Sequence, residues 1–262
     1  MRILARSLSM SLALGALSFG QKGILLEDLT WVEAEKVLKP ATVVVIPVGA
    51  EAKEHGPHLR LKNDFTMAEY FKRQVLAGAD VVVAPTVNYS YYPAFVEYPG
   101  STTLRLETAR DMFVDICRVL SKYGPRRFYA LNTGVSTMRP LEAAAGILGL
   151  EGIHFTYTNI LTAGAATEKL VSRQDGGTHA DEIETSMMLF IDPGSVDMSK
   201  AVKDFHPSPR GGLTRDPKKP GSYSATGVYG DATLATRAKG EAMVHAILAT
   251  IMQDIEVLRG KP

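Results

Sequence analysis

The feature that most constrains the fold is an alternation of apolar, strand-like runs with helical segments. Strand-like runs lie at residues 42–48, 80–85, 127–131 and 153–157. Helical patterns lie around them, at residues 65–77, 106–123, 140–150, 181–191 and 240–258, and residues 24–38 indicate an entry segment followed by a helix. Strands that are apolar on both faces are typical of parallel sheets covered by helices on both sides. The pattern therefore predicts an α/β fold, a three-layer α/β/α sandwich with a mostly parallel sheet.

The first twenty residues are set apart by their composition. Arg2 and Arg6 precede an apolar stretch at residues 8–19, which ends in small residues near Gly20. This order is typical of a secretory signal peptide, and the stretch is shorter than the roughly 20 apolar residues of a membrane span. The alternative is an amphipathic N-terminal helix. We expect an exported protein, periplasmic or secreted, with residues 1–20 as signal peptide, no membrane span and a single domain at residues 21–262.

Composition excludes several classes of function. The formal net charge is +1, or −1 without residues 1–20, so the chain has no overall attraction for nucleic acid. The single cysteine excludes an intrachain disulfide and a multi-cysteine zinc site, which leaves histidines and carboxylates as metal ligands. Neither a Gly-x-Gly-x-x-Gly turn after the first strand nor a Gly-x-Ser-x-Gly elbow occurs. Dinucleotide-binding oxidoreductases and serine hydrolases are therefore set aside.

Ligands of open parallel sheets bind beyond the carboxyl ends of the strands, which here lead into residues 49–63, 88–100 and 132–139. The first of these loops carries Glu54, His55 and Asp64 around a Gly-Pro turn. Imidazole and carboxylate together suit zinc, manganese or iron. The alternative is that Asp64 only caps the next helix and that the histidines are solvated.

The other two loops offer candidates for substrate binding. Asn132 and Thr133 stand at a strand end, where their side chains could form hydrogen bonds with a substrate. Tyr98 belongs to an aromatic loop and offers an apolar face with a polar tip, as a pocket residue needs. Packing of that loop against a neighbouring subunit is the equal alternative.

A second polar cluster occupies residues 177–186, where a polar helix start leads into an apolar helix. His179 and Glu184 could face one cleft from there. The helix dipole disfavours a protonated histidine at this end, which favours a neutral base or ligand. The alternative is an ordinary capped helix start whose acids complement the dipole.

Together the two clusters resemble the creatininase (creatinine amidohydrolase) family. The family's first motif ends in His-Gly-Pro-His-Leu and an aspartate nine residues after the first histidine, which here are residues 55–59 and Asp64. Further stretches are similar to family motifs in the same order, namely residues 98–101, 179–186 and 227–236. The matches span about residues 29–240.

The resemblance implies a binuclear centre of divalent metal that hydrolyses C–N amide bonds in small or cyclic substrates. It implies that His55 is a ligand of one metal and that Asp64 bridges two. It places His179 at the substrate as a proton shuttle, with Glu184 beside it as a ligand or acid–base group. Family members are typically homo-oligomers, commonly hexamers.

Two positions depart from the family pattern. Lys53 stands where the family has a carboxylate, and Gly134 stands where it has a metal-binding histidine. Glu54 is our preferred replacement for the missing carboxylate, with Glu51 as the alternative. Lys53 could replace the charge of one metal or hold a substrate carboxylate. We therefore expect one or two zinc, manganese or iron ions per chain.

Two functions remain open at this point. In the first, the chain is a metal-dependent amidohydrolase that cleaves a non-peptide C–N bond of a small substrate with a metal-activated water. In the second, it is a catalytically silent, exported small-molecule-binding protein that keeps the fold. The retained histidines and carboxylates favour the first, whereas the changes at Lys53 and Gly134 favour the second.

Overall fold

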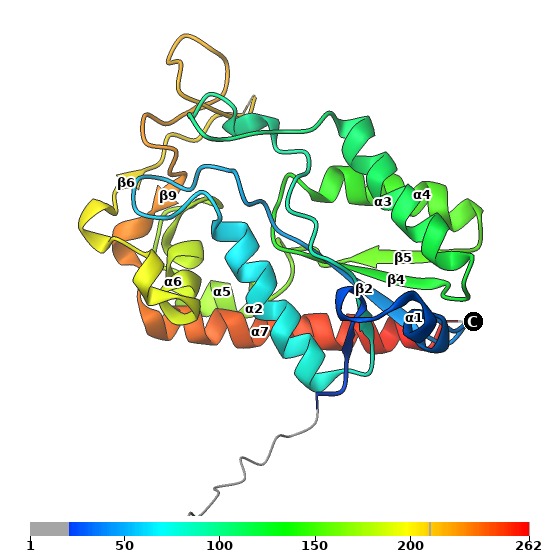
Figure 1. Ribbon diagram of the computed structural model, residues 1–262. Helices are drawn as coiled ribbons and strands as arrows, with labels where there is room; N and C mark the ends of the chain where they lie inside the picture. Colours follow the sequence, from blue (N-terminus) through cyan, green and yellow to red (C-terminus); the bar gives the residue numbers. More distant parts are fainter. Residues whose placement is uncertain (1–20, 210, 262) are drawn as a thin grey trace, which may run out of the picture.

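A computed structural model describes residues 21–209 and 211–261 (Figure 1). The expected signal peptide at residues 1–20 lies outside the described residues. Within the described part, no helix is long and apolar enough to cross a membrane.

The centre of the molecule is a five-stranded sheet in which all neighbouring strands run parallel, in the order β1-β3-β2-β4-β5. The predicted parallel sheet is therefore confirmed. The central strand β2 pairs along its whole length with β4, with Val44 opposite Phe128. The strands are β1 (Ile24–Leu25), β2 (Val43–Val48), β3 (Val82–Val83), β4 (Arg127–Asn132) and β5 (His154–Tyr157).

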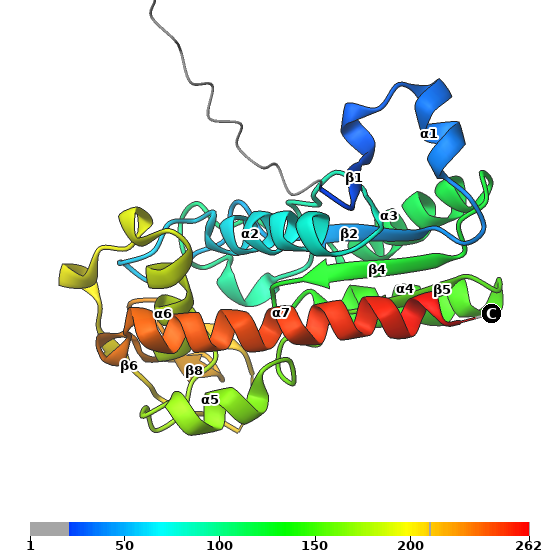
Figure 2. The ribbon, with the colours of Figure 1, turned by 90° about the horizontal axis from the view of Figure 1, so that it is seen from below.

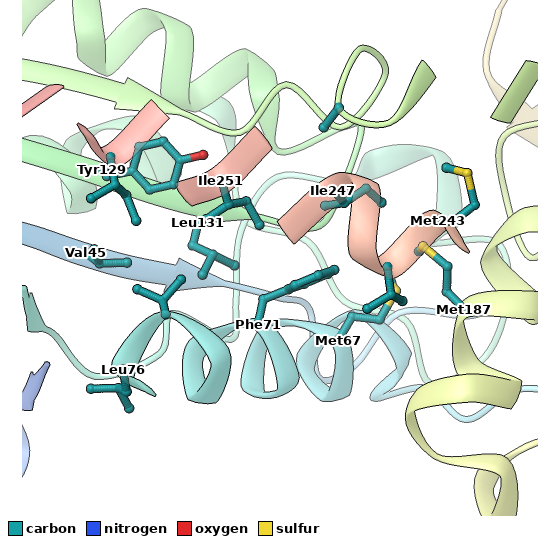
Figure 3. Packing of buried hydrophobic residues seen from close by; sticks show 14 of the residues in the cluster. Val45, Met67, Phe71, Leu76, Tyr129, Leu131, Met187, Met243, Ile247 and Ile251 are labelled. Carbon is teal, nitrogen blue, oxygen red and sulfur yellow. The ribbon is translucent and has the colours of Figure 1, made fainter. Parts of the chain in front are cut away.

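Helices cover both faces of the sheet, as predicted (Figures 1 and 2). They are α1 (Trp31–Val37), α2 (Asn63–Gly78), α3 (Leu106–Ser121), α4 (Met138–Leu150), α5 (Ala165–Val171), α6 (Glu182–Ile191) and α7 (Arg237–Arg259). Side chains of β2 alternate between two cores. Val43 and Val45 pack with residues of α2 and α7 (Figure 3), whereas Val44 and Ile46 pack with residues of α3 and α4. Burial on both faces explains why this strand is a continuous apolar run.

The segment from 201 to 231 forms small strand pairs outside the main sheet. The pairs are β6 (Lys203–Asp204) with β9 (Gly230–Asp231), and β7 (Leu213–Thr214) with β8 (Ser222–Tyr223). Five short 3-10 helices complete the described part, at Leu26–Asp28, Pro93–Phe95, Pro193–Ser195, Met198–Lys200 and Ala232–Leu234.

The start of α2 decides between two interpretations of Asp64. The helix begins at Asn63 with Lys62 as N-cap, and no side chain caps it. The interpretation of Asp64 as a mere helix cap is therefore wrong. Its carboxylate instead contacts Lys53 and His55 in the preceding loop.

Candidate metal centre

The candidate site lies beyond the carboxyl ends of β2 and β4, where the sequence predicted it. A cavity of about 520 Å³ opens there. Each of the three predicted loops contributes to its wall, with Lys53, Phe95 and Thr133 respectively. His179 and Glu184 also line the wall. The sheet topology thus brings together residues up to about 130 positions apart in the sequence.

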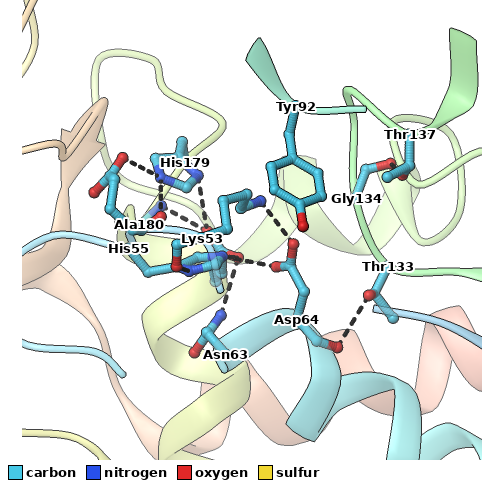
Figure 4. A network of polar contacts seen from close by, with 12 residues as sticks. Lys53, His55, Asn63, Asp64, Tyr92, Thr133, Gly134, Thr137, His179 and Ala180 are labelled. Carbon is cyan, nitrogen blue, oxygen red and sulfur yellow. Dashed lines mark hydrogen bonds and ion pairs between the residues drawn. The ribbon is translucent and has the colours of Figure 1, made fainter. Parts of the chain in front are cut away.

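His55 is fully buried, and both of its ring nitrogens face acceptors (Figure 4). Nδ1 lies 2.9 Å from the carbonyl oxygen of Lys53, to which it donates. Nε2 lies 2.7 Å from Asp64 Oδ1 and 3.3 Å from Glu184 Oε1. Burial lowers the pKa of His55, but the two carboxylates outweigh burial and raise it to about 9. An imidazole nitrogen between two carboxylate oxygens requires a positive charge, supplied by a proton or a metal ion.

Glu184, in the first turn of α6, is held in place by one side-chain donor and one backbone donor. The side-chain amide of Asn63 donates to its Oε1 at 3.0 Å, and the backbone N–H of Ala180 donates to its Oε2 at 2.6 Å. Ala180 has a φ of 47°, a strained value for a residue with a side chain, and this turn aims its N–H at the carboxylate. Burial raises the pKa of Glu184, but His55, His179 and Lys53 outweigh it, so the group stays a carboxylate.

His179 completes the cluster from the loop before α6. Its Nε2 donates to Glu54, whose Oε1 is 2.9 Å away and whose carbonyl oxygen is 3.0 Å away. Its Nδ1 lies 3.7 Å from Glu184 Oε2. Ligand atoms of His55, His179 and Glu184 all lie within 4.8 Å of one another. Glu54, our sequence-based choice of metal ligand, lies on the opposite side of the His179 ring from Glu184.

Residues 227–231 explain why a C-terminal motif belongs to this site. The N–H of Tyr229 donates to the carbonyl of His179 at 2.9 Å, which fixes the backbone of the histidine. Gly227, at a φ of 87°, leaves room for the Glu54 carboxylate, which a Cβ at this position would strike. A Cβ at Gly230 would come 2.5 Å from the Cβ of Asp181, the N-cap of α6. The motif therefore serves to position His179 and its partner Glu54.

Asp64 carries a second interaction on its other oxygen. Its Oδ2 lies 2.7 Å from the Nζ of Lys53, and both side chains are buried. Burial raises the pKa of Asp64, but Lys53 and His55 outweigh it and lower the pKa below its usual value. One carboxylate is thus shared between an imidazole and an ammonium group.

The three predicted substrate-binding residues are placed differently from one another. Thr133 lines the cavity, and its hydroxyl donates to the carbonyls of Val48 and Asp64. Asn132 is absent from the cavity wall, and its side chain bonds within the loop after β4 and to the carbonyl of Thr158, just after β5. Tyr98 is also absent from the wall, and its hydroxyl donates to the carbonyl of Ser224 at 2.8 Å. Tyr98 thus ties the aromatic loop to the 201–231 segment.

Sequence reasoning gave no role at the site to Asn63 and Ala180, both of which orient Glu184. For Asn63, the only signal in the sequence was its position next to Asp64. For Ala180 there was no signal, because it acts through its backbone N–H. Phe95 belongs to the same aromatic loop as Tyr98 and lines the cavity. Its ring lies 4.4 Å, centroid to centroid, from the ring of His179.

The donor set fits a divalent ion of the zinc or manganese type. Nε2 of His55 faces two carboxylate oxygens, and its Nδ1–H donates a hydrogen bond to a backbone carbonyl. A second hydrogen bond of this kind is the usual way in which proteins fix a metal-binding histidine. One imidazole and two carboxylates also belong to the ligand types that the single cysteine leaves available.

The fold and this cluster define an α/β protein with a buried histidine–carboxylate site at the carboxyl edge of a parallel sheet. The family model described as creatinine amidohydrolase matches residues 27–255. The chain belongs to the creatininase family, as the sequence resemblance indicated.

Two characterised relatives illustrate the range of the family. The chain is 26% identical to the creatinine amidohydrolase of Pseudomonas putida, over 89% of this chain and 96% of the relative. It is 29% identical to the mycofactocin precursor peptide peptidase of Mycolicibacterium smegmatis, over 76% of this chain and 78% of the relative. Both relatives are hydrolases by name, and one of them acts on a peptide.

Solved structures confirm the fold. A structure described as creatininase with manganese superposes with a TM-score of 0.73 at 23% identity, covering 92% of this chain and all of the other. A mutant creatininase described as the Zn–Zn type gives a TM-score of 0.71 at 23% identity, with the same coverage of both chains. This level of identity supports the three-layer architecture and nothing finer.

Proposed function

We propose that this protein is a metal-dependent amidohydrolase that cleaves a C–N bond of a small substrate bound in the cavity. The observation that carries the proposal is the convergence of Asp64 Oδ1 and Glu184 Oε1 on His55 Nε2, with Glu184 lining the cavity. A divalent ion held by these atoms would lower the pKa of a bound water and polarise the amide carbonyl. The manganese and Zn–Zn descriptions of related creatininases support a metal.

His179 is the group best placed to move a proton. Because its Nε2–H is held by Glu54, the unprotonated Nδ1 faces Glu184 and the cavity. We propose that Nδ1 accepts a proton from the attacking water and returns it to the leaving nitrogen. Glu54 keeps the ring in the right tautomer and stabilises it when it is protonated, which makes Glu54 a positioning residue.

The cavity favours a compact substrate. Its volume of about 520 Å³ is in the range of small-ligand sites, and part of its wall is apolar, with Met67, Met187 and Ile247. A non-peptide amide is our first choice. The mycofactocin peptidase relative makes a short peptide end the second choice.

Export and self-association also belong to the proposal. The charged and apolar pattern of residues 1–20 supports a cleaved signal peptide and an exported enzyme. Large apolar side chains exposed on the surface support a homo-oligomer, of six chains by family resemblance. Trp31 on α1 is 78% exposed and Leu150 at the end of α4 is 91% exposed.

Chelation tests the proposal. We expect dialysis against a chelator to lower hydrolysis of the best substrate by at least about 100-fold, because the attacking water is activated by the ion. Added zinc or manganese should restore it. The substrate panel holds creatinine, formylated amines and short peptides, measured before chelation, after it and after metal addition.

Two results would contradict the proposal. Hydrolysis that survives complete metal removal would exclude a metal-dependent reaction. Less than about 0.2 metal per chain after reconstitution, with no hydrolysis of any substrate, would favour the silent binding protein. The Lys53–Asp64 ion pair is the observation that favours that alternative.

A further inference from the structure

Asp64 presents its two oxygens to two different cationic positions (Figure 4). Oδ1 faces His55 Nε2 at 2.7 Å, where Glu184 also contributes an oxygen. Oδ2 faces Lys53 Nζ at 2.7 Å. A carboxylate that bridges two metal ions uses its oxygens in this way. Here one of the two positions is taken by a side chain of the protein itself.

The ammonium group is fixed at its position. Lys53 is only 5% exposed, and its Nζ also lies 4.8 Å from the centroid of the Phe95 ring. Its backbone N–H donates to the carbonyl of Leu61, and its own carbonyl accepts from His55. Displacing the ammonium group would leave a buried charge without its carboxylate, which is costly.

Residue 134, which lies beside Asp64 Oδ2, offers no side-chain ligand. A Cβ built on Gly134 would lie 3.6 Å from this oxygen, so a longer side chain at residue 134 would reach it. Glycine supplies no ligand atom. In residues 21–209 and 211–261, the one group of three or more potential metal ligands is that of His55, His179 and Glu184.

The charges around Asp64 also balance with a single metal ion. Three carboxylates, those of Glu54, Asp64 and Glu184, are buried or nearly so. One divalent ion and the Lys53 ammonium carry three positive charges between them. A second divalent ion beside the fixed ammonium would leave two positive charges uncompensated in a buried site, where like charges repel strongly.

We propose that the Lys53 ammonium takes the place of a second metal ion, so that the chain holds one divalent ion at His55, Asp64 and Glu184. This inference rests on the proposed function, because it presupposes that the first ion binds. The site would then contain one metal ion and one side-chain cation, the Lys53 ammonium group. The Zn–Zn relative is described with two zinc ions instead.

The experiment is a zinc titration of the metal-free, folded full chain by calorimetry, with bound zinc counted after gel filtration. Wild type should bind about one zinc ion per chain.

Lys53→Glu removes the cation and supplies a carboxylate, so the number of zinc ions bound should rise to about two. Zinc should also raise the melting temperature of this variant more than that of wild type. Lys53→Met should stay at about one, because it removes the charge without adding a ligand. Lys62→Glu is the matched control, since it makes the same charge change at an exposed position of the same loop and should also stay at about one.

Each other outcome has a distinct meaning. Two zinc ions bound by wild type would overturn this inference and leave the proposed function standing. A Lys53→Glu chain that is folded but still binds one zinc ion would also overturn it, because Lys53 would then not be what excludes the second ion. No zinc bound by folded wild type would refute the proposed function, and this inference with it.

Discussion

Replacement of Asp64 by asparagine is expected to abolish divalent-metal binding and hydrolysis and to lower the free energy of unfolding by about 3–5 kcal/mol. The stability loss arises because the buried Lys53 ammonium loses the carboxylate that lies 2.7 Å from it. The loss of metal arises because an amide oxygen is a poor substitute for a carboxylate as a metal ligand. Metal content and denaturant unfolding of the purified variant check both effects.

The double variant Asp64→Asn/Lys53→Met separates these two effects. Removing both partners of the ion pair leaves no buried unpaired charge, so much of the lost stability should return. Metal binding should not return, because the ligand is still missing. A single Asp64→Asn variant that keeps its metal and its activity would contradict the role of Asp64 as a ligand.

Replacement of His179 by alanine is expected to lower kcat by about 10²–10⁴-fold and to leave the metal content unchanged. The reason is that His179 Nδ1 is the proton carrier in our account, whereas His55, Asp64 and Glu184 hold the ion. Steady-state kinetics and metal analysis of the same preparation check this. His245→Ala, at an exposed position of α7, is the control and should behave like wild type.

The His179→Ala result can fail in two informative ways. Unchanged turnover would refute the catalytic role of the histidine. Loss of the metal together with the activity would show that His179 is itself a ligand, which its position within 4.8 Å of the ligand atoms of His55 and Glu184 allows.

The sheet and most helices could be predicted from the sequence because their signals are local. The run of β2 is apolar throughout since helices cover both of its faces. The start of α1 carries such a local signal, because the hydroxyl of Thr30 accepts the N–H of Glu33 in a capping box. Helix α5, by contrast, begins at Ala165 after a glycine N-cap, Gly164, so no side chain caps its start. The strand expected at residues 80–85 is reduced to Val82–Val83, because only these residues pair with both neighbours.

The sequence indicated which residues lie together in the candidate site, but it did not indicate which side chains bond to one another. His55, Asp64, His179 and Glu184 do converge, and the order of the motifs along the chain pointed to them. The partner of Glu54 could not be read from the sequence, because His179 lies 125 residues away. Such pairings depend on how distant loops meet above the sheet, which no local pattern records.

The direction of the Lys53 side chain could not be predicted from the sequence either. The sequence left the lysine facing either a metal position or a substrate. Its contact with Asp64 Oδ2 follows from the turn at residues 55–58 and from the packing of Phe95 over the ammonium group. These are tertiary contacts between loops.

The most direct test of the central claim is an anomalous-scattering map at the zinc edge from crystals of the zinc-loaded protein. The account predicts one strong peak about 2.0–2.2 Å from His55 Nε2 and from the carboxylate oxygens of Asp64 and Glu184. A map from folded, zinc-loaded protein with no peak there, or with its peak away from these residues, would contradict it.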